Sequence, residues 1–263
     1  MEISNKVFVV TGGGNGIGRQ VVLNLLRRGA IVAAADLSPA ALDQTSVLAA
    51  GVGKRLSTHI LDVTDRQAVE QLLLDVQEAH GHADGIINVA GIIHRFAPIM
   101  DLSLDELDRI MNVNFWGTVN MCKTFLPALR ERPAAAIVNI SSLSALLPFA
   151  GQTFYGATKA AVKLFSEGLY QELSHLNIAV TTVFPGNIST DISGNSGVAA
   201  LDPKGRKAPV TTPEATAERI VQGLEKGSFR VVIGSDARML DALSRISSRR
   251  ATDFIGAQMK SVL

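Results

Sequence analysis

The sequence lacks the features that mark a secreted or membrane-bound chain. It contains one cysteine, Cys122, so no intrachain disulfide can form, and its apolar helix-like surroundings predict a buried structural thiol. The N-terminus shows no basic segment followed by a long apolar stretch. No apolar run approaches the roughly 18 residues that cross a bilayer. We therefore expect a cytoplasmic protein without stable membrane insertion.

An excess of charge of one sign is also absent. The chain has 25 basic and 24 acidic residues, a formal net charge of +1. This balance gives no electrostatic footprint for nucleic acid or an anionic membrane. With 47% hydrophobic and 19% charged residues, the composition excludes intrinsic disorder and is typical of a soluble globular enzyme. We expect a small-molecule substrate and no nucleic-acid partner.

Histidines are few, and none is grouped as metal ligands usually are. His80 and His82 lie in the stretch EAHGHADG, which is typical of a solvated loop, while His59 and His175 are interpreted as structural. We expect no metal site.

Short apolar runs alternate with longer segments of helical period. The fully apolar strands indicate a sheet covered on both faces, and the alternation implies right-handed crossovers. We predict one domain over residues 1–263: an α/β, doubly wound (Rossmann-type), seven-stranded parallel sheet with helices on both faces, in three αβα layers. The expected strands cover residues 6–10, 30–36, 55–63, 85–90, 134–140, 178–184 and 229–234; the expected helices include 16–29, 65–80, 103–115, 116–131, 153–175 and 213–226.

Two segments fall outside this alternation. Residues 187–211 are polar and longer than a plain connection, which predicts a substrate loop or lid. Residues 236–263 form a C-terminal tail with apolar positions at helical spacing among several arginines. Such a tail can lie on a membrane surface, but packing on the protein's own body or on a partner subunit is favoured.

The stretch TGGGNGIG (11–18) connects the first predicted strand to a helix. Its glycines allow a backbone to turn tightly and approach a pyrophosphate at a helix N-terminus. The spacing is G-x-x-x-G-x-G, and alone it is also compatible with a plain tight turn. Asp36, at the end of the second predicted strand, strengthens the interpretation as a dinucleotide site, because its carboxylate can accept hydrogen bonds from an adenosine ribose.

The same carboxylate would repel the 2′-phosphate of NADP. Leu37 follows it and Asn15 lies in the glycine loop, so neither position supplies a basic group for that phosphate. Arg19 follows Gly18, but the sequence does not show whether its side chain points toward the ribose, a phosphate or solvent. NAD is therefore favoured over NADP.

A second group of motifs lies further along the chain. Tyr155 and Lys159 in FYGATK are one helical turn apart, Ser142 lies in NISSLSA, and Asn114 lies in MNVNFWG. Together with TGGGNGIG, NVAG (88–91) and FPG (184–186), this pattern resembles the short-chain dehydrogenase/reductase family over about residues 4–235. Val89 departs from the second asparagine that the family often has.

The resemblance implies a catalytic group of Asn114, Ser142, Tyr155 and Lys159. Tyr155 would be the general acid/base, Lys159 would also bind the nicotinamide ribose, Ser142 would bind the substrate oxygen, and Asn114 would hold a proton-relaying water. The cofactor set comprises Gly12, Asn15, Gly16, Ile17, Gly18, Asp36, Leu37, Asp62, Val63, Asn88, Ala90, Gly91, Tyr155, Lys159, Pro185, Gly186, Ile188 and Thr190.

The chemistry can be stated independently of the family. A tyrosine with a pKa of about 10 is a poor base near neutral pH, and an ammonium one turn away favours the phenolate. Each residue also has a plain structural interpretation: Ser142 could cap a turn, Asn114 could satisfy helix backbone, and Tyr155 could lie on the surface.

The substrate is less defined. Apolar residues in LSALLPF (143–149) favour a hydrophobic secondary alcohol or ketone, such as a steroid, lipid or ring alcohol. The candidate substrate contacts are Ser142, Leu143, His94, Phe96 and Phe149, although His94 and Arg95 could equally be surface residues.

Three further expectations complete the sequence-based hypothesis. A non-catalytic NAD-binding regulatory or scaffold protein, and an enzyme of the nucleotide-sugar epimerase/dehydratase type, remain as alternatives to a dehydrogenase. The helical pair over 103–131 resembles the dimer surface of the family, so a homodimer or homotetramer is expected.

Overall fold

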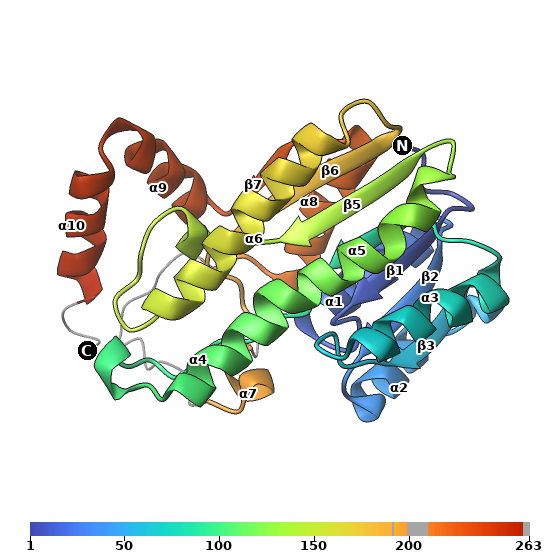
Figure 1. Cartoon of the computed structure of the whole chain (residues 1–263), viewed down its shortest axis with the longest axis horizontal. Coiled ribbons are helices and arrows are strands. Elements are labelled where there is room, and N and C mark those ends of the chain that lie inside the picture. The colour runs from blue at the N-terminus through green and yellow to red at the C-terminus, as the bar shows by residue number, and fades with distance from the viewer. Residues whose placement is uncertain (191, 199–209, 260–263) are drawn as a thin grey trace.

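A computed structural model describes residues 1–190, 192–198 and 210–259. Its centre is a parallel seven-stranded sheet in the order β3-β2-β1-β4-β5-β6-β7, which confirms the predicted doubly wound fold (Figure 1). The order reverses between β1 and β4, the position at which such sheets bind ligands beyond the carboxyl ends of their strands. The strands are β1 (Val7–Thr11), β2 (Ile31–Asp36), β3 (Leu56–Ile60), β4 (Gly85–Asn88), β5 (Ala135–Ile140), β6 (Ile178–Pro185) and β7 (Arg230–Ile233).

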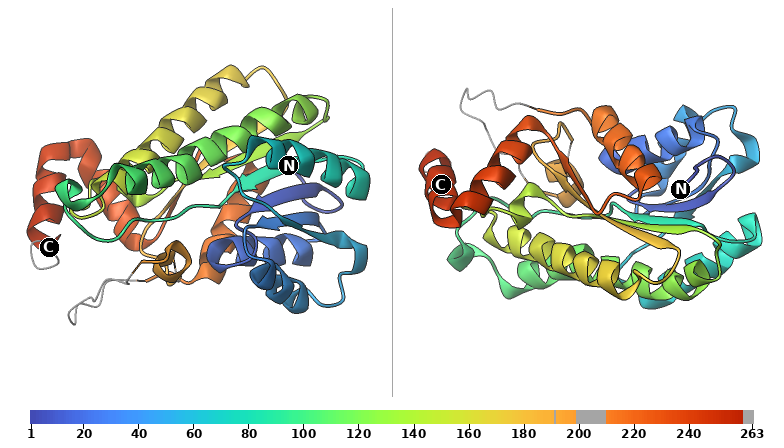
Figure 2. Two further views of the ribbon diagram at one scale, coloured as in Figure 1. Left: turned by 60° about the horizontal axis from the view of Figure 1, so that its bottom comes forward. Right: turned by 90° about the horizontal axis from the view of Figure 1, so that it is seen from above.

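Helices cover both faces of the sheet, and Figure 2 shows the three layers from the side. Side-chain caps begin two of them: Ser38 accepts a hydrogen bond from Ala41 N, and Asp65 accepts from Gln67 N and Ala68 N. The helices are α1 (Gly16–Arg27), α2 (Pro39–Leu48), α3 (Arg66–His80), α4 (Leu104–Met111), α5 (Gly117–Arg130), α6 (Thr153–Glu172), α7 (Ile192–Ser196), α8 (Pro213–Lys226), α9 (Ser235–Ile246) and α10 (Ser248–Met259).

The period of two along each strand divides the interior into two cores. In β1, Phe8 and Val10 face the core under α1 and α8, whereas Val7 and Val9 face the core under α3, α5 and α6. Both sets are fully buried. A strand buried on both faces needs apolar side chains at every position, which is why the sequence shows continuous runs instead of alternation.

The two helices expected at 103–115 and 116–131 are joined without a break. A π-helical turn over Asn112–Trp116 connects α4 to α5, so the sequence-based boundary at residue 115 was wrong. Such a turn inserts one residue into the helical ladder and turns a side chain away from its regular direction. Asn114 lies inside this turn and is fully buried.

The C-terminal tail forms α9 and α10, which extend from one end of the sheet in Figure 1. Leu240 of α9 and Ile255 of α10 pack in one buried cluster with Leu143 and Leu147, which follow β5. The expected packing on the protein's own body is therefore confirmed for the described part of the tail. In the predicted substrate loop, residues 191 and 199–209 lie outside the described residues. No helix among the described residues is long and apolar enough to cross a membrane.

Candidate active site

The glycine loop lies at the switch point between β1 and β4. Gly12 adopts φ +68°, and a Cβ on Gly18 would lie only 2.0 Å from the carbonyl oxygen of Gly12, so a side chain at residue 18 is excluded. The Asn15 side chain caps α1 by accepting a hydrogen bond from Gly16 N at 2.9 Å. The main chain of the loop thus lies close to the N-terminus of α1. The helix dipole would stabilise an anion bound at this position.

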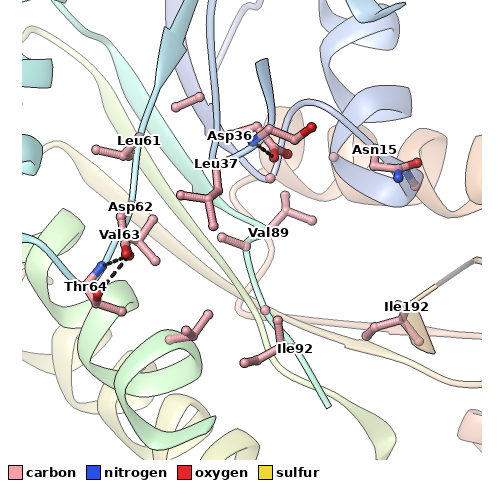
Figure 3. Close-up of a pocket in the computed structure, with 18 of the residues that line it drawn as sticks. Asn15, Asp36, Leu37, Leu61, Asp62, Val63, Thr64, Val89, Ile92 and Ile192 are labelled. Carbon is pink, nitrogen blue, oxygen red and sulfur yellow. Dashed lines mark hydrogen bonds between the residues drawn. The ribbon is translucent and has the colours of Figure 1, made fainter. Parts of the chain in front are cut away.

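A cleft of about 780 Å³ opens above this loop. In Figure 3, Asp36 and Leu37 lie between Asn15 and the Asp62–Val63 pair, and Ile192 approaches from α7. The cleft is large enough for an extended dinucleotide. Of the predicted cofactor residues, those that line it are Gly12, Asn15, Gly16, Ile17, Gly18, Asp36, Leu37, Asp62, Val63, Ala90, Gly91 and Thr190.

Asp36 is fixed at the rim of the cleft by backbone donors. Its Oδ2 accepts from Gly14 N at 2.9 Å and its Oδ1 from Ser38 N at 3.0 Å. Arg19 points elsewhere: its Nε donates to the carbonyl of Gly14 at 2.9 Å, and its Nη2 donates to Gln44 on α2 at 3.0 Å. The carboxylate at the rim is therefore held in place, and the nearby guanidinium already binds protein groups.

Six predicted cofactor residues are not among those that line the described cleft: Tyr155 and Lys159 of α6, and Asn88, Pro185, Gly186 and Ile188. Asn88 is buried and donates to Asn139 Oδ1 at 2.8 Å, so it joins two strands beneath the site. Pro185 ends β6, Gly186 follows it and donates to the carbonyl of Ile233 at 2.8 Å, and Ile188 forms a bridge with Thr211.

Lys159 reaches the same edge of the sheet from α6. It is 4% exposed, and its Nζ donates to the carbonyl of Ile140, at the end of β5, at 3.1 Å. A Cβ on Gly91 would lie 3.1 Å from Lys159 Nζ and 3.2 Å from Asn114 Oδ1. Gly91 is thus the point where the cleft meets these two side chains. Burial lowers the pKa of Lys159 to about 8.

Tyr155 is half-buried, one helical turn before Lys159. Burial raises the pKa of its phenol above the ordinary value, and a hydrogen bond with Ser142 opposes that increase. Lys159 Nζ lies 6.0 Å from the centre of the tyrosine ring. In the protein alone, burial is the largest influence on the pKa of this phenol.

Ser142 and Asn114 combine structural bonds with their position in the site. Ser142 Oγ accepts from Ser144 N at 3.1 Å and caps a short 3₁₀ turn, as the plain interpretation expected. Asn114 bonds both backbone groups of Ile92: its Oδ1 accepts from the N–H at 2.8 Å and its Nδ2 donates to the carbonyl at 2.9 Å. It also donates to Thr158 on α6 at 3.1 Å. Asn114 therefore connects α4, the loop after β4 and α6.

The candidate substrate contacts separate into different environments. Leu143 is buried in the cluster with α9 and α10, while Phe96 and Phe149 are half-buried. His94 is buried rather than on the surface, and both of its ring nitrogens bond to backbone groups. Arg95 is exposed and pairs with Glu106 at 3.0 Å.

Some residues that line the cleft could not be recognised as site residues from the sequence. One wall comes from α4 and the π turn, and Ile192 contributes from α7; the α4-side residues are Asp105, Asp108, Arg109, Asn112 and Val113. No motif marks them, because they are far in sequence from the glycine loop and approach it only after the chain folds.

Three histidines away from the cleft contact protein groups. His80 ends α3 and shares Ser57 Oγ with His59, both at 2.8 Å, so its assignment to a solvated loop was wrong. His82 contacts the buried carboxylate of Asp84 at 3.1 Å. Among the described residues, no group of three or more His, Cys, Asp or Glu side chains is arranged to hold a metal.

Comparison with known proteins decides the family. The model of the short chain dehydrogenase family matches residues 6–199, well over half of the chain. The chain belongs to the short-chain dehydrogenase family. A relative in Mycobacterium tuberculosis, "Putative oxidoreductase SadH", is 37% identical over 254 residues, which cover 93% of this chain and 92% of SadH.

Two further similar proteins have a named activity or a bound cofactor. The 3-oxoacyl-[acyl-carrier-protein] reductase FabG of Thermotoga maritima is 33% identical over 73% of this chain and 78% of FabG. The crystal structure of a short chain dehydrogenase from Burkholderia cenocepacia, in complex with NADP, has a TM-score of 0.79 and 28% identity, covering 95% of this chain and 97% of that one. This short-chain dehydrogenase is accordingly an oxidoreductase that depends on NAD or NADP.

Proposed function

We propose that this short-chain dehydrogenase interconverts a secondary alcohol and its ketone, with Tyr155 as the general acid/base. The observation that carries the proposal is that side chains from three elements converge near the edge of the cleft: Tyr155 and Lys159 of α6, Asn114 of the π turn and Ser142 of the turn after β5. Lys159 and Asn114 approach Gly91 directly, and Ser142 contacts Tyr155. Structural roles alone would not require all four to meet where a cofactor cleft ends.

Each residue has a distinct task in this proposal. Tyr155 removes the hydroxyl proton of the alcohol in oxidation and returns a proton to the carbonyl oxygen in reduction. Ser142 donates a hydrogen bond to the same substrate oxygen and positions it against the phenol. Lys159 favours the phenolate and binds ribose hydroxyls, and Asn114 holds a water that connects the lysine to solvent. A bound nicotinamide accepts the hydride in oxidation and supplies it in reduction.

The residues of the cleft favour NAD as the preferred cofactor. Asp36 presents a carboxylate at the rim, which can accept from ribose hydroxyls and repels a 2′-phosphate. Arg109, the one basic residue among the described residues that line the cleft, comes from α4 and is accompanied by Asp105 and Asp108. The NADP complex of the B. cenocepacia relative makes this preference a point to test directly.

For the substrate we propose a hydrophobic secondary alcohol or ketone: a lipid, a steroid or a ring alcohol. Phe149 and Leu146 pack against the cluster that joins the turn after β5 to α9 and α10, so the region beyond Ser142 is apolar. FabG, whose name identifies a 3-oxoacyl substrate, supports the lipid class within this set.

We further propose that the whole chain acts as one domain and that it assembles as a homodimer or homotetramer. Leu104 of α4 and Trp116 of the π turn are exposed large hydrophobic side chains on the helical pair that resembles the family's dimer surface.

A panel of secondary alcohols and ketones, followed through the absorbance of NADH and in parallel of NADPH, tests the proposal. Stoichiometric NADH formation from at least one hydrophobic alcohol supports a dehydrogenase, with faster turnover with NAD than with NADP. A protein that binds NADH but turns over no member of the panel would instead support a regulatory or scaffold role. Retention of tightly bound NAD without net NADH release would support the epimerase-type alternative.

A further inference from the structure

His94, in the loop that follows β4, is bound on both sides of its ring although it is not part of the proposed catalytic group. The residue is 3% exposed. Its Nδ1 lies 2.7 Å from the carbonyl oxygen of Arg95, and its Nε2 lies 3.3 Å from the backbone nitrogen of Tyr155. A buried imidazole therefore contacts the backbone of the residue proposed as the general acid/base.

These two partners define the protonation of the ring. A carbonyl oxygen can only accept, so Nδ1 carries the proton, and the Tyr155 N–H can only donate, so Nε2 must be unprotonated. The imidazole is neutral in this geometry. A second proton on Nε2 would place two donors face to face at a buried position.

The first turn of α6 needs an acceptor at this point. Backbone N–H groups in the first turn of a helix have no partner within the helix, and Gln152, at the N-cap position, makes no capping bond with its side chain. Its amide instead donates to the carbonyl of His94 at 2.7 Å. His94 therefore supplies from another element the cap that the local sequence lacks, while its backbone is tied to the same helix end.

A second close contact leaves little freedom in this turn. A Cβ on Gly156, the residue after Tyr155, would lie 2.9 Å from the carbonyl oxygen of Ser144, in the turn that Ser142 begins. The backbone around Tyr155 is thus held between the Ser142 turn on one side and the His94 ring on the other. Both contacts act on the backbone that sets the direction of the phenol.

We propose that His94 is a positioning residue, which fixes the phenol of Tyr155 against Ser142 by accepting a hydrogen bond from the Tyr155 N–H. The proposal rests on the proposed function, in which Tyr155 transfers the proton. Displacement of a catalytic group by about 1 Å can reduce turnover by about a hundredfold, so loss of this bond is expected to reduce kcat by about tenfold to a hundredfold.

Two substitutions separate the hydrogen bond from the packing of the ring. His94→Gln places an amide oxygen near the position of Nε2 and can still accept from Tyr155 N. His94→Leu fills similar space without an acceptor. His175→Leu, at an exposed position beyond the end of α6, is the matched control. The measurements are kcat and KM, the Kd for NADH from fluorescence, and hydrogen exchange of the Tyr155 amide by NMR.

The proposal expects faster exchange of the Tyr155 amide and reduced kcat in His94→Leu, with a Kd for NADH close to that of the wild type. His94→Gln should recover both exchange protection and most of kcat, and His175→Leu should resemble the wild type. Equal kcat in the Leu and Gln variants, or an unchanged Tyr155 exchange rate in His94→Leu, would overturn the proposal.

The exchange measurement requires no substrate, so it also separates this inference from the proposed function. If the wild-type protein turns over no alcohol but the Tyr155 amide is protected in a His94-dependent manner, the bond stands and the dehydrogenase proposal falls. If turnover is normal in His94→Leu, the dehydrogenase proposal stands and the role of His94 falls.

Discussion

The carboxylate of Asp236 accepts a hydrogen bond from the backbone N–H of Asn187 at 2.9 Å, and this bond joins the first turn of α9 to the loop after β6. Two glycines make room for it. A Cβ on Gly186 would lie 2.6 Å from Asp236 Oδ1, and a Cβ on Gly234 would lie 2.3 Å from the same oxygen. The C-terminal tail is therefore connected to the segment after β6 in which the family resemblance places the cofactor residues Gly186 and Ile188.

Replacement of Asp236 by alanine should weaken cofactor binding. Without the carboxylate the Asn187 N–H loses its charged partner, a bond worth about 1.5–3 kcal/mol, and part of that loss is expected as a rise of about tenfold in the Kd for NADH. Fluorescence titration measures the change. Asp253→Ala, which removes an exposed partner of Arg249 on α10, is the control. A Kd equal to that of the wild type would show that the tail does not support the cofactor loop.

Tyr155→Phe should abolish most of the proposed activity. The ring and its packing remain while the proton donor is removed, so kcat is expected to fall by about 10²–10⁴-fold, with little change in the Kd for NADH. The sequence has only two tyrosines, and Tyr170, whose ring packs on Phe229, offers Tyr170→Phe as the control. Turnover near the wild-type rate in Tyr155→Phe would exclude the tyrosine mechanism.

Asp36→Asn should shift cofactor preference toward NADP. The amide oxygen can still accept from Gly14 N, but the negative charge that opposes a 2′-phosphate is gone. We expect about a tenfold rise in the KM for NAD together with a lower KM for NADP, measured with one alcohol. Asp43→Asn, on the exposed side of α2, controls for the change in net charge. An unchanged ratio of the two KM values would mean that Asp36 does not select the cofactor.

The sheet and the glycine loop were predictable because their signals are local. Continuous apolar runs are required wherever a strand has a core on each face, and the absence of space beside Gly18 follows from a turn of fixed shape. Capping residues such as Ser38 and Asp65 also act on their own helices. These features depend on residues that are neighbours in sequence.

The roles of His94, Asn88 and the α4 wall could not be predicted in this way. His94 bonds a residue 61 positions later in the chain, and Asn88 bonds Asn139 on another strand. Each partner is known only once the sheet order is known. The environment of Tyr155 is hidden for a related reason: the spacing to Lys159 is visible in sequence, but the burial that raises the pKa of the phenol is not.

Asp84 provides a test of stability at the opposite end of the sheet from the cleft. Burial alone would raise the pKa of this carboxyl, but the bond from Val7 N and the guanidinium of Arg132 hold it below the ordinary value. A depressed pKa stabilises the folded protein above the ordinary range of an aspartate, and that stabilisation is lost as pH falls through the folded-state pKa.

Asp84→Asn should therefore reduce the free energy of unfolding by about 3 kcal/mol near neutral pH, since it leaves Arg132 without its buried partner. The deficit should shrink as pH is lowered toward the range in which wild-type Asp84 takes up a proton. Urea unfolding at a series of pH values measures both effects, with the exposed Asp43→Asn as reference. A deficit that stays constant over the whole acidic range would contradict the assignment.

Lys159 should lower stability at neutral pH. Burial lowers its pKa to about 8, so below that pH the folded protein contains a charged ammonium in a site that favours the neutral amine. Between about pH 8 and the ordinary lysine pKa near 10.4, the unfolded chain binds more protons than the folded one, and the stability contribution of this group rises with pH.

Lys159→Met should consequently stabilise the protein near neutral pH while removing activity. The shift to about pH 8 corresponds to an upper limit of roughly 3 kcal/mol, reduced by the loss of the hydrogen bond to the carbonyl of Ile140. The advantage over the wild type should decrease as pH rises above about 8, because the wild-type lysine then loses its charge. Lys163→Met, one turn later on α6 and paired with Glu167, is the matched control. If Lys159→Met were less stable than the wild type at neutral pH and its deficit did not change with pH, the lysine would be a structural support of α6 instead of a charge held there for binding and proton transfer.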